Sequence, residues 1–282
     1  MDSTLLALVL GALQGVLEWL PVSSEGVLAI ALTGLGTGSL DAASLALVLH
    51  GGTAVAALAY YRREVAGLLR TLPTWRPGTA FGAGTADLSF YVLATLASGL
   101  TGAAGFLVLE EVATAVAGGA FVILVGVLLV ATGALLWRAE RADGPGGAGG
   151  ATAAVAGRRD SPGPLDAVLV GLLQGLAVLP GVSRSGTTVG ALLLRGHGGP
   201  DALRLSFVLS IPAAGGAAAI AYAQHGLPAV GPGPAALALG TSAVVGVLTV
   251  DGLTRLVRRV AFSRVCLGFG ALAVVGGALT LV

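Results

Sequence analysis

A short polar stretch interrupts the apolar chain twice, and the two copies align without gaps. Residues 14–26 read QGVLEWLPVSSEG, and residues 174–186 read QGLAVLPGVSRSG. The Gln, the first Gly, the Val, the Ser after it and the last Gly coincide at one offset of 160 positions (174 − 14). The same offset relates further pairs downstream, which are Asp41 and Asp201, Ala42 and Ala202, Val48 and Val208, and Leu49 and Leu209. We interpret this register as an internal duplication, in which each copy runs through a Pro/Gly/Ser-rich break between two apolar segments.

The composition indicates a membrane protein. Hydrophobic residues make up 55% of the 282 residues and charged residues only 10%, whereas soluble domains carry about 25% charged residues. So few charges cannot cover a soluble globule, and long apolar stretches suit lipid. The net charge of +1 provides no basic footprint, so we expect no nucleic-acid partner.

The apolar pattern predicts an all-α polytopic membrane protein with six transmembrane helices and two re-entrant helical hairpins. The interrupted segments 4–33 and 165–194 are the expected hairpins, because each arm is shorter than the ~20 residues of a full crossing. Glu110 and Glu111 are expected to mark a tight turn between the second and third spans. The expected spans are 44–61, 88–109, 113–137, about 202–223, 234–254 and 262–282.

The chain is predicted to be a single integral membrane domain built from two halves. Residues 1–137 form the first inverted repeat and residues 165–282 the second. Residues 138–164 are rich in Gly and Ala and are expected to be a flexible cytoplasmic linker. A polar-leaning loop with Pro73 and Trp75 is expected after the first full span.

Arginine placement predicts the orientation in the cell membrane. All 15 Lys+Arg residues are arginines. Every arginine except Arg184 falls on one side of this layout, which the positive-inside rule makes cytoplasmic, so both termini are predicted to lie outside. The first hairpin then enters from outside and the second from inside, as in inverted repeats that share a site near the midplane. The one-sided arginines are Arg62, Arg63, Arg70, Arg76, Arg138, Arg141, Arg158, Arg159, Arg195, Arg204, Arg255, Arg258, Arg259 and Arg264.

The two breaks carry groups that suit an anion. Ser/Gly breaks at helix ends present backbone N–H groups and hydroxyls, although serines in a membrane helix also serve simply to satisfy freed backbone groups. Arg184 in the second break is costly to bury, so it should have an anionic partner or ligand, and its planar fork suits phosphate or carboxylate. Because one break carries an arginine and the other carries acids, we favour an anion-binding site over a purely structural role for the serines.

Acidic residues and one histidine offer further chemistry. Glu18 follows Gln14 by one helical turn, so the pair shares a face and could hold a divalent ion, relay a proton, or join helices. Glu25 lies close to the break and is either part of the site or solvated. His50 lies in the first full span, where a lone buried histidine is more often structural than catalytic, so its expected role is auxiliary.

At these motifs the chain resembles the undecaprenyl-diphosphate phosphatases, the bacitracin-resistance membrane family. The resemblance covers nearly the whole chain and rests on the QxxxE of Gln14 and Glu18, PVSSEG at 21–26, PGVSRSGTT at 180–188 and SFVLSIP at 206–212. It implies hydrolysis of a C55 polyprenyl diphosphate to the monophosphate, which recycles the lipid carrier. It also implies help from a divalent cation such as Mg²⁺ or Ca²⁺, contact with membrane lipids and, often, a homodimer.

Carried over by position, the resemblance implies that Ser24 is the nucleophile, that Glu18 with Gln14 binds the metal or acts as base, and that Arg184 holds the diphosphate. The family usually has a histidine where this chain has Val27, so either Glu18, Glu25 or His50 takes its place or the histidine is not essential. Further substrate-phosphate ligands are expected at Ser23, Gly26, Ser183, Ser185, Gly186 and Thr188. The alternative function is a flippase or transporter of polyprenyl phosphate or another anion, because inverted repeats with re-entrant hairpins are transporter architecture.

Overall fold

A computed structural model describes residues 3–116, 118–142, 159–226, 231–257 and 260–281. Across these ranges the chain forms eleven α-helices and two short 3₁₀ turns. Six of the helices are long and apolar enough to cross a membrane, so the predicted all-helical, multi-pass architecture is confirmed. They are α3 (Ser39–Tyr60), α5 (Ala86–Ala115), α6 (Gly118–Ala142), α9 (Gly199–His225), α10 (Pro232–Val257) and α11 (Phe262–Leu279).

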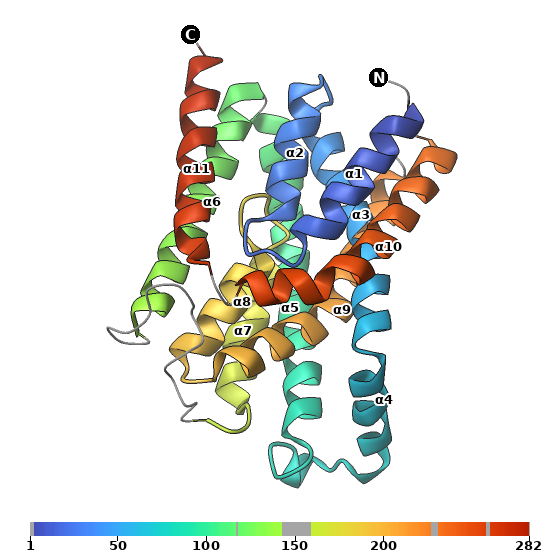
Figure 1. Ribbon diagram of the computed structural model, residues 1–282, viewed down its shortest axis with the longest axis vertical. Coiled ribbons are helices and arrows are strands. Elements are labelled where there is room, and N and C mark those ends of the chain that lie inside the picture. The colour runs from blue at the N-terminus through green and yellow to red at the C-terminus, as the bar shows by residue number, and fades with distance from the viewer. Residues whose placement is uncertain (1–2, 117, 143–158, 227–230, 258–259, 282) are drawn as a thin grey trace.

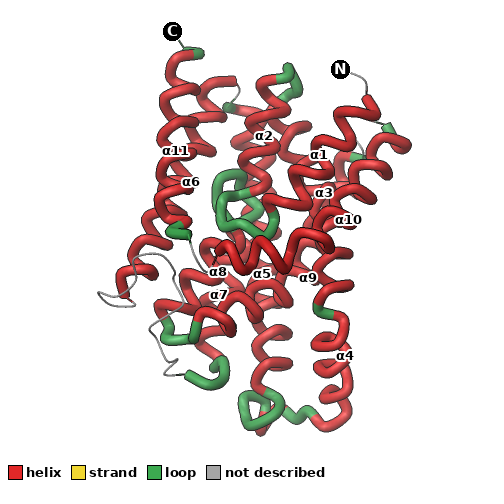
Figure 2. Tube along the Cα trace, in the orientation of Figure 1, coloured by secondary structure: helices red, strands yellow, loops and turns green. Residues whose placement is uncertain are grey.

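Four shorter helices form two pairs at the duplicated motif. The first pair is α1 (Ser3–Leu17) with α2 (Ser24–Gly34), and the second is α7 (Pro164–Leu176) with α8 (Arg184–Leu194). Each has 11 to 15 residues, fewer than the ~20 that cross a bilayer. Figure 1 shows α1 and α2 in the half of the molecule that holds both termini, with α7 and α8 in the other half. The loops inside the two pairs meet in the middle (Figure 2).

The same local chemistry starts α2 and α8. Ser23 and Ser183 are the N-cap residues, and each Oγ accepts a hydrogen bond at 3.2 Å from the backbone N–H three residues on, that of Gly26 and Gly186 respectively. An N-cap hydroxyl satisfies one of the backbone donors that a helix start leaves free. The Ser-x-x-Gly spacing that the two copies share is therefore a repeated capping device.

Matched glycines bring the helices of the two halves close together. Helix α1 packs on α10, and its counterpart α7 packs on α5. Gly11 and Gly15 of α1 lie so close to backbone atoms of α10 that any side chain would collide with them. Gly171 and Gly175 of α7 lie equally close to backbone atoms of α5. Small residues allow such close packing of membrane helices. Two further pairs, α3 with α9 and α6 with α11, also pack against each other.

Two sequence predictions about loops are wrong. Glu110 and Glu111 do not form a turn, because α5 continues through them to Ala115; Gly118, with φ 59°, starts α6 just beyond. A helix, α4 (Arg62–Thr71), occupies part of the expected polar loop. The apolar side of α4 packs against the core through Val65 and Leu68, which explains why a charged segment folds as an amphipathic helix.

The predicted linker is only partly described. Helix α6 extends to Ala142, into the expected linker, and α7 begins at Pro164. Residues 143–158, which include Arg158, lie outside the described residues, as do Arg258 and Arg259. Figure 1 shows the two chain termini at one end of the molecule, opposite α4 and the C-terminal end of α6.

Candidate active site

The two breaks lie against each other. The backbone N–H of Gly181 donates to Ser23 Oγ at 3.0 Å, and Ser185 Oγ donates to the Leu20 carbonyl at 3.1 Å. A side chain on Gly26 would come within 3.0 Å of the Gly181 nitrogen, so the glycine permits this approach. Two segments about 160 residues apart thus form one polar centre (Figure 2).

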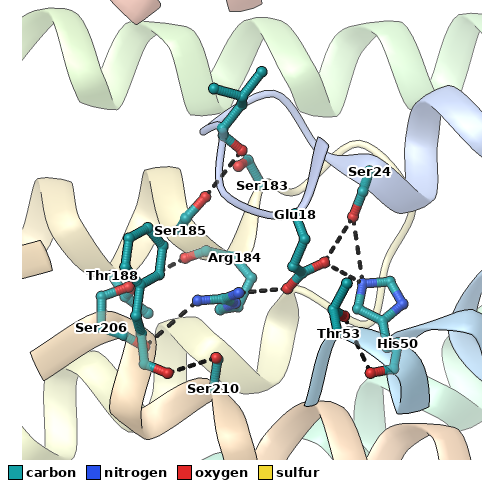
Figure 3. A network of polar contacts seen from close by, with 12 residues as sticks. Glu18, Ser24, His50, Thr53, Ser183, Arg184, Ser185, Thr188, Ser206 and Ser210 are labelled. Atoms are coloured by element: carbon teal, nitrogen blue, oxygen red, sulfur yellow. Dashed lines mark hydrogen bonds and ion pairs between the residues drawn. The ribbon is translucent and has the colours of Figure 1, made fainter. Parts of the chain in front are cut away.

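An ion pair joins the two copies at this centre (Figure 3). Arg184 Nη2 contacts Glu18 Oε1, and both side chains are buried, with 8% and 6% of their surface exposed. Arg184 also donates to the Ser206 carbonyl at 3.4 Å, and its guanidinium lies 5.8 Å from the Phe207 ring centre. The anionic partner predicted for the buried arginine is therefore Glu18.

The other oxygen of Glu18 is equally engaged. Glu18 Oε2 accepts hydrogen bonds from Gln14 Nε2 at 2.9 Å and from Ser24 Oγ at 3.0 Å. His50 Nε2 lies 3.0 Å from the same atom. A carboxylate offers about four lone-pair positions, and Glu18 uses its two oxygens to contact four groups.

His50 and Glu25 complete the cluster. His50 comes from α3, where its Nδ1 lies 2.8 Å from the Ala46 carbonyl. His50 Nε2 lies 2.9 Å from Glu25 Oε1 and 3.4 Å from Ser24 Oγ. The structure thus brings into the site the two residues that the sequence assigned only auxiliary roles. Val27 lies one turn beyond Ser24 in α2 and is partly exposed.

The expected phosphate ligands are occupied with each other. Ser23 and Ser183 cap their helices, and Ser23 Oγ also lies 3.4 Å from Glu25 Oε2. Thr188 Oγ1 donates to the Arg184 carbonyl at 2.8 Å and lies 2.6 Å from Ser206 Oγ. These hydroxyls hold the two breaks and helices α8 and α9 together. Their binding of substrate phosphate stays a prediction, as does that of Ser185, Gly26 and Gly186.

A cavity of about 520 Å³ begins at this cluster and runs between α5 and α9. Glu18, Glu25, His50 and Arg184 form part of its wall. Most of the remaining wall is apolar and is built largely from small residues, which are Gly99, Gly102, Ala103, Ala213, Ala214, Gly216 and Ala217, with Phe106, Leu107 and Ile220. An elongated apolar ligand with a charged head suits this combination.

The sequence analysis missed part of the cavity wall. Thr95 and Ser98 of α5 line the cavity, as does Gln174. Gln174 Nε2 donates to Ser98 Oγ at 3.3 Å, so this residue joins α7 to α5. Thr95 and Ser98 stand outside any motif, and their only sequence signal is a hydroxyl within an apolar span.

The donor set does not fit a resident divalent cation. Gln14 turns its amide nitrogen towards Glu18, and the Glu18 oxygens already contact Arg184, Ser24 and His50. Gln14 Oε1 is buried and has no hydrogen-bond partner among the described residues, but one amide oxygen falls short of the several oxygen ligands that Mg²⁺ or Ca²⁺ needs. In the described part of the chain, no group of three or more His, Cys, Asp or Glu residues is arranged to hold a metal.

Known proteins resemble this chain over nearly its whole length. Residues 7–273 match the family described as bacitracin resistance protein BacA. The chain is 55% identical to the undecaprenyl-diphosphatase of Haloarcula marismortui, over 99% of each chain. It is 37% identical to the enzyme of the same name from Methanothrix thermoacetophila, over 94% of this chain and 93% of the relative. A bacterial relative of that name, from Geobacter sulfurreducens, is 37% identical over 90% of this chain and 89% of its own. The chain is therefore a member of the BacA family.

Proposed function

We propose that this protein is an undecaprenyl-diphosphatase, an integral membrane hydrolase that cleaves the diphosphate of a polyprenyl lipid carrier to the monophosphate and phosphate. Full-length relatives of that name support the activity. The observation that carries it is the buried Arg184–Glu18 pair beside Ser24, at the polar end of an apolar cavity. A charged diphosphate and an apolar prenyl chain match the two parts of this site.

Two helix starts and one guanidinium supply the electrostatics. Ser24 and Arg184 are the first residues of α2 and α8, and helix N-termini favour negative charge. The terminal phosphoryl group takes the place of Glu18 on Arg184, whose fork then stabilises charge on the transferring group. This exchange also frees Ser24 from Glu18.

Ser24 then attacks the terminal phosphorus. A bond forms between Ser24 Oγ and phosphorus, the bond from phosphorus to the bridging oxygen breaks, and its electron pair leaves with the prenyl monophosphate. Water attacks the phosphoserine in a second step, which releases phosphate and restores the Ser24 hydroxyl. Trapping of labelled phosphoserine after an acid quench separates this route from direct attack by a water molecule that Ser24 positions.

Phosphate release from a polyprenyl diphosphate by the purified protein in detergent tests the proposal. Glu18→Gln should abolish release, because it removes the charge that orients Arg184 and leaves that arginine buried without its partner. The matched control is Glu111→Gln, an exposed acid in the outer part of α5, which should keep the wild-type rate. Wild-type protein that releases no phosphate would overturn the assignment.

The membrane arrangement that we propose is an inverted repeat with α1–α2 and α7–α8 as re-entrant hairpins. The exchanged packing supports it, since α1 contacts α10 of the other half while α7 contacts α5. The one-sided arginines support termini outside the cell membrane. Cysteines introduced at Glu111 and Arg141, both exposed, should react with impermeant reagents from outside and inside respectively; labelling of both from one face contradicts the arrangement.

A transporter is the second candidate, favoured by the same exchanged packing of two halves around a central site. A transporter would move polyprenyl phosphate into or out of vesicles without releasing phosphate. The phosphate-release assay therefore separates the two functions.

Two further features rest on the resemblance. Chelation of divalent cations tests the first feature. A fall in phosphate release supports a role for the cation, and an unchanged rate contradicts it. A homodimer is tested by the mass of the protein in detergent, with a monomer contradicting it.

A further inference from the structure

We propose that the cavity binds only the first few prenyl units of the lipid, about four, and that Gly99 and Gly216 are specificity-determining residues that leave room for them. The rest of the chain leaves sideways between α5 and α9 into the membrane. This inference rests on the proposed phosphatase function and adds to it which part of the lipid the protein recognises.

The charged cluster lies at one end of an apolar groove. Arg184 donates to the Ser206 carbonyl at 3.4 Å, and its guanidinium lies 5.8 Å from the Phe207 ring centre, so the phosphate end is next to this turn of α9. From there the wall of the cavity continues along residues within 212–224 of α9 and 95–107 of α5, and these two stretches form the groove. A chain attached to the bound diphosphate therefore enters the groove.

The groove is short compared with a C55 chain. At the rise of an α-helix, each of the two stretches is ~18 Å long. A prenyl unit has four backbone bonds where a residue has three, so an extended unit spans ~4–5 Å. About four units therefore fill the groove. A C55 chain is ~50 Å long when extended, so most of it lies outside.

Contacts between α5 and α9 close the far end of the groove. Phe106 lines the cavity and stacks on His225, with the ring centres 5.9 Å apart. His225 Nε2 lies 3.2 Å from Glu110 Oε1, one turn beyond Phe106 on α5. A chain longer than the groove meets these side chains and does not continue straight along the two helices.

The side of the groove is open. Gly99, Ala103 and Leu107 on α5, and Gly216 and Ile220 on α9, line the cavity and are also exposed. Leu107 and Ile220 are 62% and 48% exposed. Both helices are long and apolar enough to cross a membrane, and exposed apolar side chains on such helices face lipid. The chain therefore leaves the groove through this opening.

Gly99 and Gly216 are glycines that helix packing does not explain. Glycine in the middle of a helix costs stability, and in membranes it commonly permits close contact between helices. A Cβ at either position would have no neighbouring atom within 4 Å. Both residues line the cavity, ~6 Å beyond the phosphate end of their stretches. Their missing side chains keep the groove open from the second prenyl unit onwards.

The groove selects the chain by shape. A prenyl chain moves from one apolar medium, the bilayer or the micelle, into another, so the groove gains little hydrophobic free energy from it. Packing of the first units in the groove instead places the diphosphate at Arg184 and Ser24. Units beyond the opening are in lipid both before and after binding, so they add little to recognition.

Leucine at each of the two glycines is the main test. Gly99→Leu and Gly216→Leu should each lower kcat/KM for a C20 diphosphate by about tenfold or more, because the new side chain occupies the path of the second unit. For a C5 diphosphate both variants should stay within about twofold of the wild type, since that chain ends before the glycines. Each variant is compared with the wild type on the same substrate in the same detergent, so differences in micelle partition between substrates cancel.

Gly240 provides the matched control. It lies in the spanning helix α10, it is exposed, and a Cβ there also has no atom within 4 Å. Gly240→Leu adds the same apolar surface away from the groove and should leave both substrates unchanged. A loss that C5 and C20 share in the groove variants, or full C20 turnover in both of them, would overturn the role of the groove.

A series of chain lengths measures where recognition ends. At a fixed mole fraction in the micelle, wild-type kcat/KM should rise up to about C20 and then stay within about threefold up to C55. A rise that continues through C55 overturns the short groove. Wild-type protein that releases no phosphate from any of these lipids overturns the phosphatase assignment and this inference with it, whereas an active wild type that fails either test overturns the groove alone.

Discussion

The two breaks share a scaffold but differ in charge. In both, a serine caps a short helix through the N–H of a glycine three residues on, at 3.2 Å. The first break then carries Glu18 and Glu25, and the second carries Arg184 where the first has Ser24. The two breaks thus have similar helix starts, but the first is the acidic side and the second is the cationic side. Neither copy alone contains the ion pair.

The backbones of the breaks differ as well. Ser23 has φ 59°, and it is the only described residue other than glycine with a positive φ, whereas Ser183 has φ −68°. The second break places its left-handed residue two positions earlier, at Gly181, with φ 102°. Ser23 has this left-handed backbone, and its Oγ accepts hydrogen bonds from the N–H groups of both Gly26 and Gly181. The strained serine therefore connects the first break to the second.

Arg184→Lys tests the cationic side of this comparison. Arg184→Lys keeps a positive charge but loses the planar fork that can bind a phosphoryl group through two parallel hydrogen bonds. We expect phosphate release to fall by about 10³-fold, as for removal of an arginine that stabilises phosphoryl transfer, while the protein still inserts and purifies. Arg195→Lys, at the surface end of α8, is the control and should stay near the wild-type rate. Near-normal turnover in Arg184→Lys would show that the guanidinium fork is not needed, and near-normal turnover in Arg184→Ala would show that the two breaks do not divide the work by charge.

Gly181→Ala tests the backbone of the second break. A side chain here would adopt a strained φ and meet the Val125 backbone and the Leu128 side chain of α6. We expect a loss of about 3 kcal/mol or more in stability, measured as earlier thermal inactivation in detergent. Gly190→Ala in α8, where the nearest atoms lie at 3.6 Å or beyond, should be close to neutral. Equal stability of the two variants would contradict the close contact between break and α6.

The pair α7 and α8 is also anchored differently at its start from the pair α1 and α2. Asp166 is fully buried and accepts from Arg195 Nε at 2.6 Å and from the Gly163 N–H at 2.8 Å, whereas its counterpart in the first copy is Leu6. Burial raises the pKa of the Asp166 carboxyl, but the hydrogen bonds from Arg195, Gly163 and His197 outweigh it and hold the pKa below its ordinary value.

Because the pKa of Asp166 is lower in the folded protein, its carboxylate stabilises the fold at pH values above the pKa of an unfolded Asp, about 3.9. This stabilisation is lost as the pH falls through the pKa of Asp166 in the folded protein. Asp166→Asn should therefore cost about 1.5–3 kcal/mol at pH 7, and the difference from the wild type should shrink towards pH 3. Thermal unfolding at several pH values measures it. A difference that stays constant with pH would rule out the charge as the cause.

The smallest expected effect is the difference in stability between variants that lose the N-cap serine of α8 or of α2. Ser183→Ala removes one cap and should cost about 0.5–2 kcal/mol. Ser23→Ala removes a cap and also leaves the Gly181 N–H without its acceptor, so it should cost more than Ser183→Ala. Parallel thermal inactivation of the two variants makes the comparison, and a larger loss for Ser183→Ala would show that Ser23 is not the joint between the breaks.

Composition and spacing determined most of the architecture. Low charge and segment lengths predicted six spans and two shorter helix pairs, because a bilayer demands apolar stretches of a given length. The constant offset of 160 also predicted that the two breaks are equivalent. Pattern alone misplaced the turn at Glu110, since charged residues near a helix end carry no signal about which side of the turn they occupy.

Only the tertiary structure decided how the polar groups combine. The partner of Arg184, and the meeting of His50 with Ser24 and Glu25, depend on contacts between α1, α2, α3 and α8. A lone histidine in an apolar span looks structural in sequence, because its role is set by what lies across from it. The hydrogen bonds of the serines also depend on the tertiary structure. Their partners are set by how closely the glycine-lined helices approach one another, and the spacing of residues along the chain does not determine that approach.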